Sequence, residues 1–203
     1  MNVGQEPPFT GGRPVVRAAL AWATRMHYGQ SRAVDEAPFI LHPVEVAALL
    51  SSRGCDEEVI VAGLLHDAVE KTVVEVDEIR RRFGDRVADI VAAVTEDPAI
   101  PDDAARKAAL REQVAGAGPD AQIVFAADKL AKTRELRAQA ARTDEALENA
   151  ALRARLEHYE ASLRMLEREA PELPFTHQLA FELWAMRVLP PRSAPSVPAA
   201  AVS

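Results

Sequence analysis

The sequence has a single cysteine and no long apolar run, and each absence excludes a class of protein. With Cys55 alone, no disulfide can form within the chain, and a reducing compartment is expected. The first residues lack the basic start and apolar centre of a signal peptide. No apolar run approaches the ~20 residues that are needed to span a bilayer. We therefore expect a cytoplasmic protein with no membrane partner.

Positive charge is also scarce. The chain has 24 Lys and Arg against 31 Asp and Glu, which gives a net charge of −7, and the pI is about 5.3. A nucleic-acid-binding protein needs a basic face that displaces counterions, so nucleic acid is not expected as a partner. A local basic pocket for a phosphorylated small molecule is compatible with this balance. Nothing in the sequence indicates an oligomeric state.

Strand patterns are nearly absent, and the residues that favour helices dominate. Ala, Leu, Glu and Arg prevail from Val15 to Leu189, without sustained alternation of apolar and polar residues. We predict an all-α fold, a helical bundle of about eight to ten helices. Residues 13–189 are long enough for one domain. Residues 1–12 are expected to be a flexible N-terminus, and the Pro/Ala-rich residues 190–203 a disordered tail.

Four residues, His42, His66, Asp67 and Asp128, stand out because ionisable side chains interrupt apolar helical segments. Burying even a neutral polar group without a partner costs about 2–7 kcal/mol. Imidazole and carboxylate together are ligands for a hard or borderline divalent metal ion, which would satisfy all four. The alternative for the His66-Asp67 pair alone is a satisfied polar pair at the end of a core helix. His42 and Asp128, in similar contexts, favour the metal site.

Glu70 lies four residues after His66 and three residues after Asp67. On a continuous helix, positions three and four apart share a face, so Glu70 would lie over both residues. Glu70 would then project toward the same space as the metal ligands. There it could reach a water molecule bound to the metal. Glu70 and Asp67 are therefore the candidate catalytic residues.

Seven short motifs resemble the HD superfamily of metal-dependent phosphohydrolases, in particular the hydrolase domain of RelA/SpoT-type proteins and the stand-alone small alarmone hydrolases of the metazoan SpoT-homologue type. The resemblance extends from about Val15 to Leu166. The motifs are, in order, residues 27–32 (HYGQSR), 38–43 (PFILHP), 64–70 (LLHDAVE) with Thr72, 83–84 (FG), 94–97 (VTED), 106–107 (RK) and 127–130 (ADKL). Each motif alone is weak, but seven in order are specific.

The resemblance implies an all-α fold that binds Mn²⁺ and removes the 3′-pyrophosphate of guanosine tetra- or pentaphosphate. It implies that the metal ligands are His42, His66, Asp67 and Asp128, and that Glu70 is the first carboxylate of a catalytic Glu-Asp pair. It also places Arg32 beside the site, and Arg106 and Lys107 near the substrate phosphates. Relatives of this kind have been linked to removing a phosphate from NADPH, so a different phosphorylated nucleotide is an alternative substrate.

Three positions depart from the pattern of the family. Lys71 replaces the second acid of the Glu-Asp pair, Lys132 replaces an asparagine four residues after the last ligand, and Ala33 replaces a lysine. Two added lysines make the pocket more positive, which weakens metal binding and attracts an anionic substrate. The enzyme could therefore be retuned to another nucleotide, or it could be a sensor that binds a nucleotide without cleaving it. Alternatively, both lysines point outward and pair with surface acids.

Tyr159 lies in a long periodic segment, residues 144–169, where relatives place side chains that contact the substrate. Tyr159 is therefore a candidate substrate-binding residue together with Arg32, Arg106, Lys107, Lys71 and Lys132. The leucines around it repeat at steps of three and four residues, as in a helix that packs on a core. Core packing is thus the alternative role, and the spacing favours it.

Overall fold

The computed structural model describes residues 6–33, 35–140 and 150–188, and within these ranges helices are joined by loops and turns. The only extended pairing in the described part is an isolated bridge between Ser31 and Pro38. The prediction of an all-α fold is confirmed. The elements are η1 (Pro8–Thr10), α1 (Pro14–Met26), α2 (Leu41–Ser52), α3 (Glu57–Leu65), α4 (Ala68–Lys71), α5 (Val76–Phe83), α6 (Asp85–Val94), α7 (Asp103–Gly116), α8 (Pro119–Ala140), α9 (Ala150–Glu169) and α10 (Thr176–Val188).

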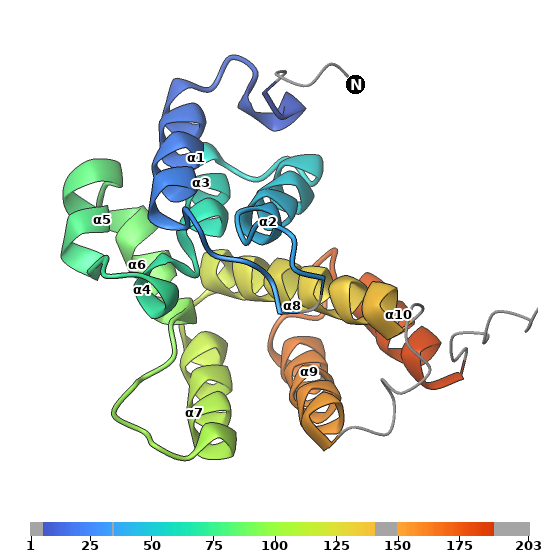
Figure 1. Ribbon diagram of the computed structural model, residues 1–203. Coiled ribbons are helices and arrows are strands. Elements are labelled where there is room, and N and C mark those ends of the chain that lie inside the picture. Colours follow the sequence, from blue (N-terminus) through green and yellow to red (C-terminus); the bar gives the residue numbers. More distant parts are fainter. Residues whose placement is uncertain (1–5, 34, 141–149, 189–203) are drawn as a thin grey trace, which may run out of the picture.

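The longest helix, α8, runs through the middle of the molecule (Figure 1). The helices α2, α3 and α6 pack against it from one direction, and α7, α9 and α10 also contact it. Helix α3 is enclosed by α1, α2, α6 and α8, and each residue from Val59 to Leu65 is buried. Because α3 and α8 are the two most enclosed helices, polar groups on them are held in fixed positions.

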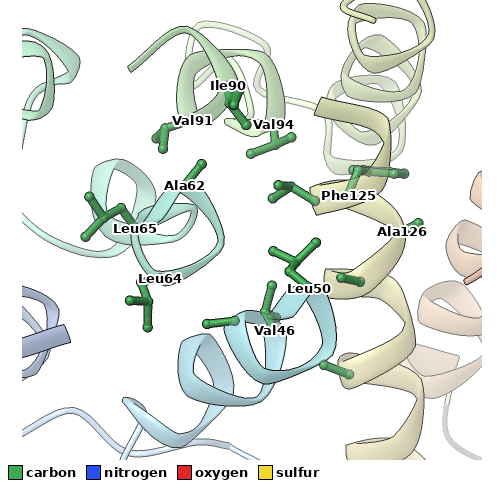
Figure 2. Packing of buried hydrophobic residues seen from close by; sticks show 14 of the residues in the cluster. Val46, Leu50, Ala62, Leu64, Leu65, Ile90, Val91, Val94, Phe125 and Ala126 are labelled. Carbon is green, nitrogen blue, oxygen red and sulfur yellow. The ribbon is translucent and has the colours of Figure 1, made fainter. Parts of the chain in front are cut away.

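Figure 2 shows buried side chains of α2, α3, α6 and α8 packed into one core, among them Leu50, Val91 and Phe125. Helices α2 and α3 approach closely because α3 has a glycine at the contact. A Cβ atom on Gly63 would lie 2.4 Å from Leu50 Cδ1. This close contact brings the start of α2 and the end of α3 together.

The described residues of the N-terminal segment pack on the helices: η1 contacts α1 and α2, and Thr10 is buried. The division into residues 1–12, 13–189 and 190–203 stays a prediction. The Thr10 hydroxyl donates to the Pro7 carbonyl at 2.8 Å, and Glu6 pairs with Arg17 at 2.8 Å. The predicted tail, residues 190–203, and the segment 144–149 lie outside the described residues. No helix in the described ranges has the length and apolarity to cross a bilayer.

The predicted continuous helix through His66 and Asp67 is wrong. Helix α3 ends at Leu65, and α4 begins at Ala68 after a two-residue turn. The ring nitrogen Nδ1 of His66 lies 2.8 Å from the carbonyl oxygen of Gly63. In a continuous helix that carbonyl would accept from the amide of Asp67. The side chain therefore competes with the helix and ends it, which turns His66 and Asp67 toward the interior.

The close contact of α2 and α3 gives a test of the packing. We expect Leu50→Ala to lower the free energy of unfolding by about 2–5 kcal/mol, because a fully buried leucine leaves a cavity. Gly63→Ala should be less destabilising in the Leu50→Ala background than in the natural chain, because the new methyl group enters that cavity. Urea unfolding of the double-mutant cycle measures this coupling. Leu41→Ala, at a residue that is 46% exposed, is the control; additive effects of the two core changes would contradict the described contact.

Candidate active site

Three separate segments bring the four predicted metal ligands together. His42 lies in the first turn of α2, His66 and Asp67 form the turn between α3 and α4, and Asp128 lies in the middle of α8. All four are between 1% and 4% exposed. One ligand atom each from His42, His66 and Asp128 lie within 4.8 Å of one another. The Asp67 atom Oδ2 lies 3.7 Å from His42 Nε2 and 3.5 Å from His66 Nε2.

Hydrogen bonds fix the orientation of both imidazole rings. Nδ1 of His42 donates to Glu135 at 3.0 Å, and Nδ1 of His66 donates to the Gly63 carbonyl at 2.8 Å. Both Nε2 atoms then point inward and lie 3.3 Å apart. Oδ1 of Asp128 lies 3.0 Å from Nε2 of His42 and 3.4 Å from Nε2 of His66. Partners of this kind at the distal nitrogen are usual for histidines that bind metals. Burial disfavours the charged His42 ring, but its hydrogen bonds to Asp128 and Glu135 raise the pKa to about 9.

The chemistry of these residues fits a divalent metal ion. Burial acts to raise the pKa values of Asp67 and Asp128, but the neighbouring lysines and histidines lower both well below the usual range. Two ionised carboxylates are thus held next to two imidazoles in a dry environment. Oδ2 of Asp67 is buried and has no hydrogen-bond partner among the described residues. An ion that takes oxygen and nitrogen ligands would satisfy this atom.

Two lysines also reach the carboxylates. Nζ of Lys132 lies 2.8 Å from Asp128 Oδ1 and 3.8 Å from Asp67 Oδ1. Nζ of Lys129 lies 2.8 Å from the other oxygen of Asp128 and 4.4 Å from the centre of the Phe125 ring. The alternative in which Lys132 points outward to surface acids is therefore wrong. Lys132 follows Asp128 by one helical turn, so it shares the face that the buried ligand occupies.

A cavity of about 670 Å³, within the size range of small-molecule sites, has His42 in its wall. The other three candidate ligands line a smaller pocket that shares Glu70, Lys129 and Lys132 with this cavity. The sequence contains four lysines, and all four line this cavity. It is lined by Gln30, Ser31, Arg32, Ala33, Phe39, His42, Glu70, Lys71, Glu96, Lys107, Lys129, Lys132, Glu135, Leu136, Arg155, His158 and Tyr159. Six of these side chains are cationic Lys or Arg, and three are Glu. The lining therefore carries positive charge, although the whole chain is acidic.

Most of the predicted substrate-binding residues line this cavity, but Arg106 does not. Its guanidinium group donates to Glu96 at 2.6 Å, to Asp103 at 2.7 Å and to the Ile100 carbonyl at 3.0 Å. These acceptors hold Arg106 beside the cavity wall. Lys107, the next residue, pairs with Asp103 at 2.5 Å and does line the cavity.

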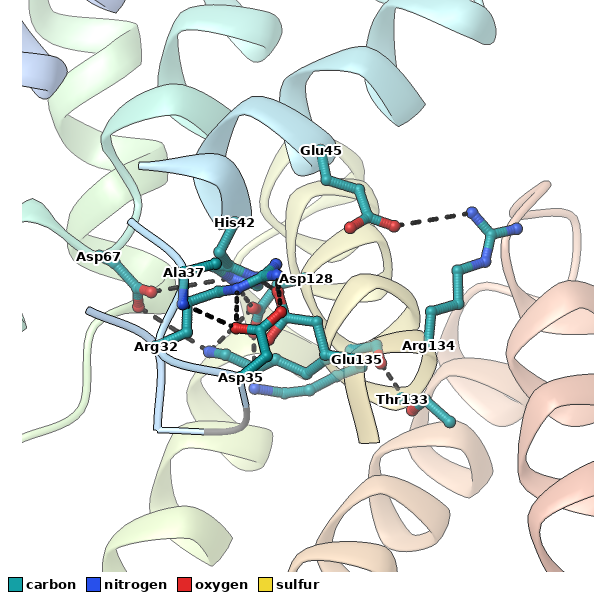
Figure 3. A network of polar contacts seen from close by, with 12 residues as sticks. Arg32, Asp35, Ala37, His42, Glu45, Asp67, Asp128, Thr133, Arg134 and Glu135 are labelled. Atoms are coloured by element: carbon teal, nitrogen blue, oxygen red, sulfur yellow. Dashed lines mark hydrogen bonds and ion pairs between the residues drawn. The ribbon is translucent and has the colours of Figure 1, made fainter. Parts of the chain in front are cut away.

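Arg32 lines the cavity, but its guanidinium group already has two carboxylate partners. Nε donates to Asp35 at 3.0 Å, and NH1 donates to Glu135 at 3.1 Å. The same Glu135 oxygen accepts from His42 (Figure 3). Arg32 therefore positions His42, a candidate ligand, through Glu135. Sequence reasoning missed Glu135; its signal was its place two helical turns after Asp128, on the same face of α8.

Glu70 lies between the ligands and the cavity. It lines both the large cavity and a pocket of about 30 Å³ that also includes His66, Asp67 and Asp128. Oε1 of Glu70 accepts a hydrogen bond from the Glu96 amide at 2.6 Å, which leaves Oε2 for other partners. Partial burial in the cavity wall is the main cause that raises the pKa of the Glu70 carboxyl, and the hydrogen bond from Glu96 opposes it. The break between α3 and α4 has therefore not separated Glu70 from the ligands.

Helix α9 contributes His158 and Tyr159 to the opposite wall of the cavity. Arg111 donates to Nδ1 of His158 at 2.7 Å. Because arginine has no acceptor, Nδ1 accepts and the proton of the neutral ring lies on Nε2. Burial, followed by the charges of Lys129 and Arg111, lowers the pKa of His158 to about 2. Tyr159 is only 7% exposed, and burial raises its pKa to about 12. Tyr159 thus packs in the core and also borders the cavity.

With this fold and site described, comparison with known proteins defines the class. The HD domain family matches residues 19–156, more than half of the chain. The chain therefore belongs to the HD domain family, and the resemblance found in its motifs is confirmed.

Several relatives are named for guanosine nucleotide metabolism. The human protein named guanosine-3′,5′-bis(diphosphate) 3′-pyrophosphohydrolase MESH1 is 38% identical over 121 residues, which are 58% of this chain and 67% of that protein. A protein from Aquifex aeolicus, also named guanosine-3′,5′-bis(diphosphate) 3′-pyrophosphohydrolase, is 43% identical over 81 residues. This match covers 40% of this chain and 12% of the Aquifex protein, so this chain spans only a small part of that relative.

Two solved structures have the same fold. A structure from Listeria monocytogenes EGD-e has a TM-score of 0.64 and 31% identity, and the match covers 72% of this chain and 96% of that one. A structure described as a metazoan orthologue of SpoT that hydrolyses ppGpp has a TM-score of 0.71 at 24% identity. It covers 91% of this chain and 99% of that one, and it supports the fold.

The neutral state of His158 leads to a prediction about stability and pH. Its pKa is about 2 in the folded chain and about 6.5 in the unfolded chain, so below pH 6.5 the unfolded state takes up a proton that the folded state does not. His158 should therefore contribute to stability above pH 6.5, and this contribution should fall by up to about 1.4 kcal/mol per pH unit below it. We expect His158→Asn to lose this slope when urea unfolding is measured from pH 7 to pH 5. His177→Asn, at an exposed histidine, is the matched control. If the free energy of unfolding had the same dependence on pH in His158→Asn and in the natural chain, the neutral state of His158 would be contradicted.

Proposed function

We propose that the chain is a metal-dependent phosphohydrolase of phosphorylated nucleotides. The observation that carries the proposal is that candidate metal ligands and a lysine-lined cavity adjoin each other. The four candidate ligands are buried, and His42 lines a cavity that all four lysines of the chain also line. The other three candidate ligands line a small pocket that shares Glu70, Lys129 and Lys132 with this cavity. Such a lining matches a compact, highly charged anion, and the ligands match a divalent cation. For this substrate class, guanosine 3′,5′-bis(diphosphate) is the best candidate, cleaved at the 3′-pyrophosphate, because relatives with 38% and 43% identity carry that name.

The metal ion is proposed to be Mn²⁺, held by His42, His66, Asp67 and Asp128. When bound, a divalent ion supplies Lewis-acid chemistry: it makes a water molecule more acidic and neutralises phosphoryl oxygens. The single cysteine and the phosphorylated small-molecule substrate are consistent with a place in the cytoplasm, which is part of the proposal.

The side chains of the cavity wall have separate proposed roles in proton transfer, phosphate binding and positioning of His42. Glu70 lines the pocket that includes three candidate ligands, and Oε1 is the oxygen that accepts from the Glu96 amide. Glu70 is therefore the proposed general base that takes a proton from the attacking water. Lys107 and Lys71 provide positive charge at the cavity wall for the distal phosphates. Arg32 holds Glu135 and thereby the His42 ring. Nε2–H of His158, on the opposite wall, is a neutral donor for the substrate.

A second candidate function is a sensor that binds a nucleotide without cleaving it. The specific observation in its favour is that the ammonium group of Lys132 contacts both candidate metal-binding carboxylates. A permanent Lys132 contact would neutralise Asp67 and Asp128 in place of a metal ion. Cleavage and binding can be separated by experiment.

The test is release of pyrophosphate from guanosine 3′,5′-bis(diphosphate), followed by ion-exchange chromatography with and without Mn²⁺. We expect Mn²⁺-dependent turnover, which Glu70→Gln lowers by about 10²–10⁴-fold in kcat, the usual contribution of a general base. His66→Ala should lose both bound Mn²⁺ and turnover, whereas Glu70→Gln should keep the metal.

NADPH is the parallel substrate, with release of inorganic phosphate as the readout. If only NADPH is turned over, the chain is still a phosphohydrolase, but its substrate is NADPH and not guanosine 3′,5′-bis(diphosphate). A chain that binds Mn²⁺ and guanosine 3′,5′-bis(diphosphate) but releases no product would contradict the hydrolase and favour the sensor.

A further inference from the structure

Lys132 contacts the same atom that the two candidate metal-binding histidines share. Its Nζ lies 2.8 Å from Asp128 Oδ1, and this oxygen lies 3.0 Å from His42 Nε2 and 3.4 Å from His66 Nε2. Nζ also lies 3.8 Å from Asp67 Oδ1. The ammonium group therefore contacts the carboxylates of both α8 and the turn between α3 and α4.

A divalent ion and this ammonium group would compete for the same oxygen. An ion held by Asp128 and Asp67 would be close to Nζ, because Nζ contacts both carboxylates. Two positive charges at that separation repel strongly in a buried site, where water screens them little. Metal binding and the observed position of Lys132 are therefore linked, and each weakens the other.

Lys132 is more exposed than its neighbour Lys129, although both lysines line the small pocket with the candidate ligands and the large cavity. The Lys132 side chain is 28% exposed. Lysine has a flexible stem of four carbons, so its charge can move between the two spaces. The Lys129 side chain is only 6% exposed, and it is held between Asp128 and the Phe125 ring.

We propose that Lys132 is an exchangeable counter-ion of the metal site: it neutralises Asp67 and Asp128 before a divalent ion enters, and it then moves into the cavity to meet a substrate phosphate. The inference rests on the metal site of the proposed function, and it adds a role for a residue that departs from the pattern of the family. Two consequences follow. Lys132 lowers the affinity of the site for metal, and metal entry exposes the Lys132 amine.

The first consequence is tested by Mn²⁺ affinity, measured by calorimetry on the full chain. Lys132→Met, which keeps the apolar stem and removes the charge, should bind Mn²⁺ at least tenfold more tightly than the natural chain. Lys107→Met is the matched control, because Lys107 lines the same cavity but pairs with Asp103, and its Mn²⁺ affinity should stay within threefold. If Lys132→Met folds only with Mn²⁺, its affinity is measured instead by competition with a chelator. Lys132→Gln, which also removes the charge, then serves as the second variant.

The second consequence is tested by acetylation with acetic anhydride and mass spectrometry. With only four lysines in the chain, each site can be followed separately. Mn²⁺ should raise the reactivity of Lys132 severalfold relative to Lys107, and Lys129 should remain protected.

The outcomes separate this inference from the proposed function. Equal Mn²⁺ affinities for the natural chain and Lys132→Met would overturn the counter-ion role and leave the metal site intact. Tighter binding by Lys132→Met, without a change in the reactivity of Lys132, would overturn the movement into the cavity. Absence of Mn²⁺ binding in every variant would overturn the metal site of the proposed function, and this inference with it.

Discussion

The buried pair of carboxylates, Asp67 and Asp128, is the constraint on which the site depends. Ionised carboxylates in a dry interior need positive charge nearby, because the cost of burying an unpaired ion is several kcal/mol or more. Three separate parts of the chain supply that charge or polarity: α2 through His42, the turn after α3 through His66, and α8 through two lysines. The close packing of α2 and α3 at Gly63 then serves the chemistry as well as the core, because it fixes how far apart the two histidines lie.

A set of hydrogen bonds around Glu135 holds the candidate ligand His42 in place. Glu135 accepts from both His42 and Arg32, and Arg32 in turn binds Asp35, so the loop before α2 is tied to α8 (Figure 3). All four lysines line the cavity together with Arg32 and Arg155, whereas Arg86 holds Asp56, Glu58 and Asp120 together at the surface.

The sequence predicts the helical class and the four clustered residues because both depend on local patterns. Missing alternation excludes strands, and ionisable residues in apolar helices indicate groups that need partners. The end of α3 at Leu65 was not predictable from such patterns, because it arises when the ring of His66 takes a backbone carbonyl. The place of Arg106 beside the cavity depends on Glu96, ten residues earlier in sequence. Glu135 was missed because a glutamate in a long polar helix is usually a solvated surface residue, and only the position of His42 gives it a role.

The two lysines that depart from the family pattern have different physical consequences. Nζ of Lys71 lies 5.4 Å from the centre of the Phe39 ring. Within the described residues Lys71 makes no ion pair with Asp67 or Asp128, so it changes only the charge of the cavity wall. Its neighbour Glu70 keeps its hydrogen bond to the Glu96 amide and stays in the pocket that includes the ligands. Lys132 instead contacts both carboxylates directly. In the proposed function, the change at position 71 would therefore affect which anion binds, and the change at position 132 would affect whether a metal ion binds. Because Lys132 borders both spaces, an anion in the cavity that attracts it away from Asp128 would favour metal binding, and by linkage a bound metal would favour the anion.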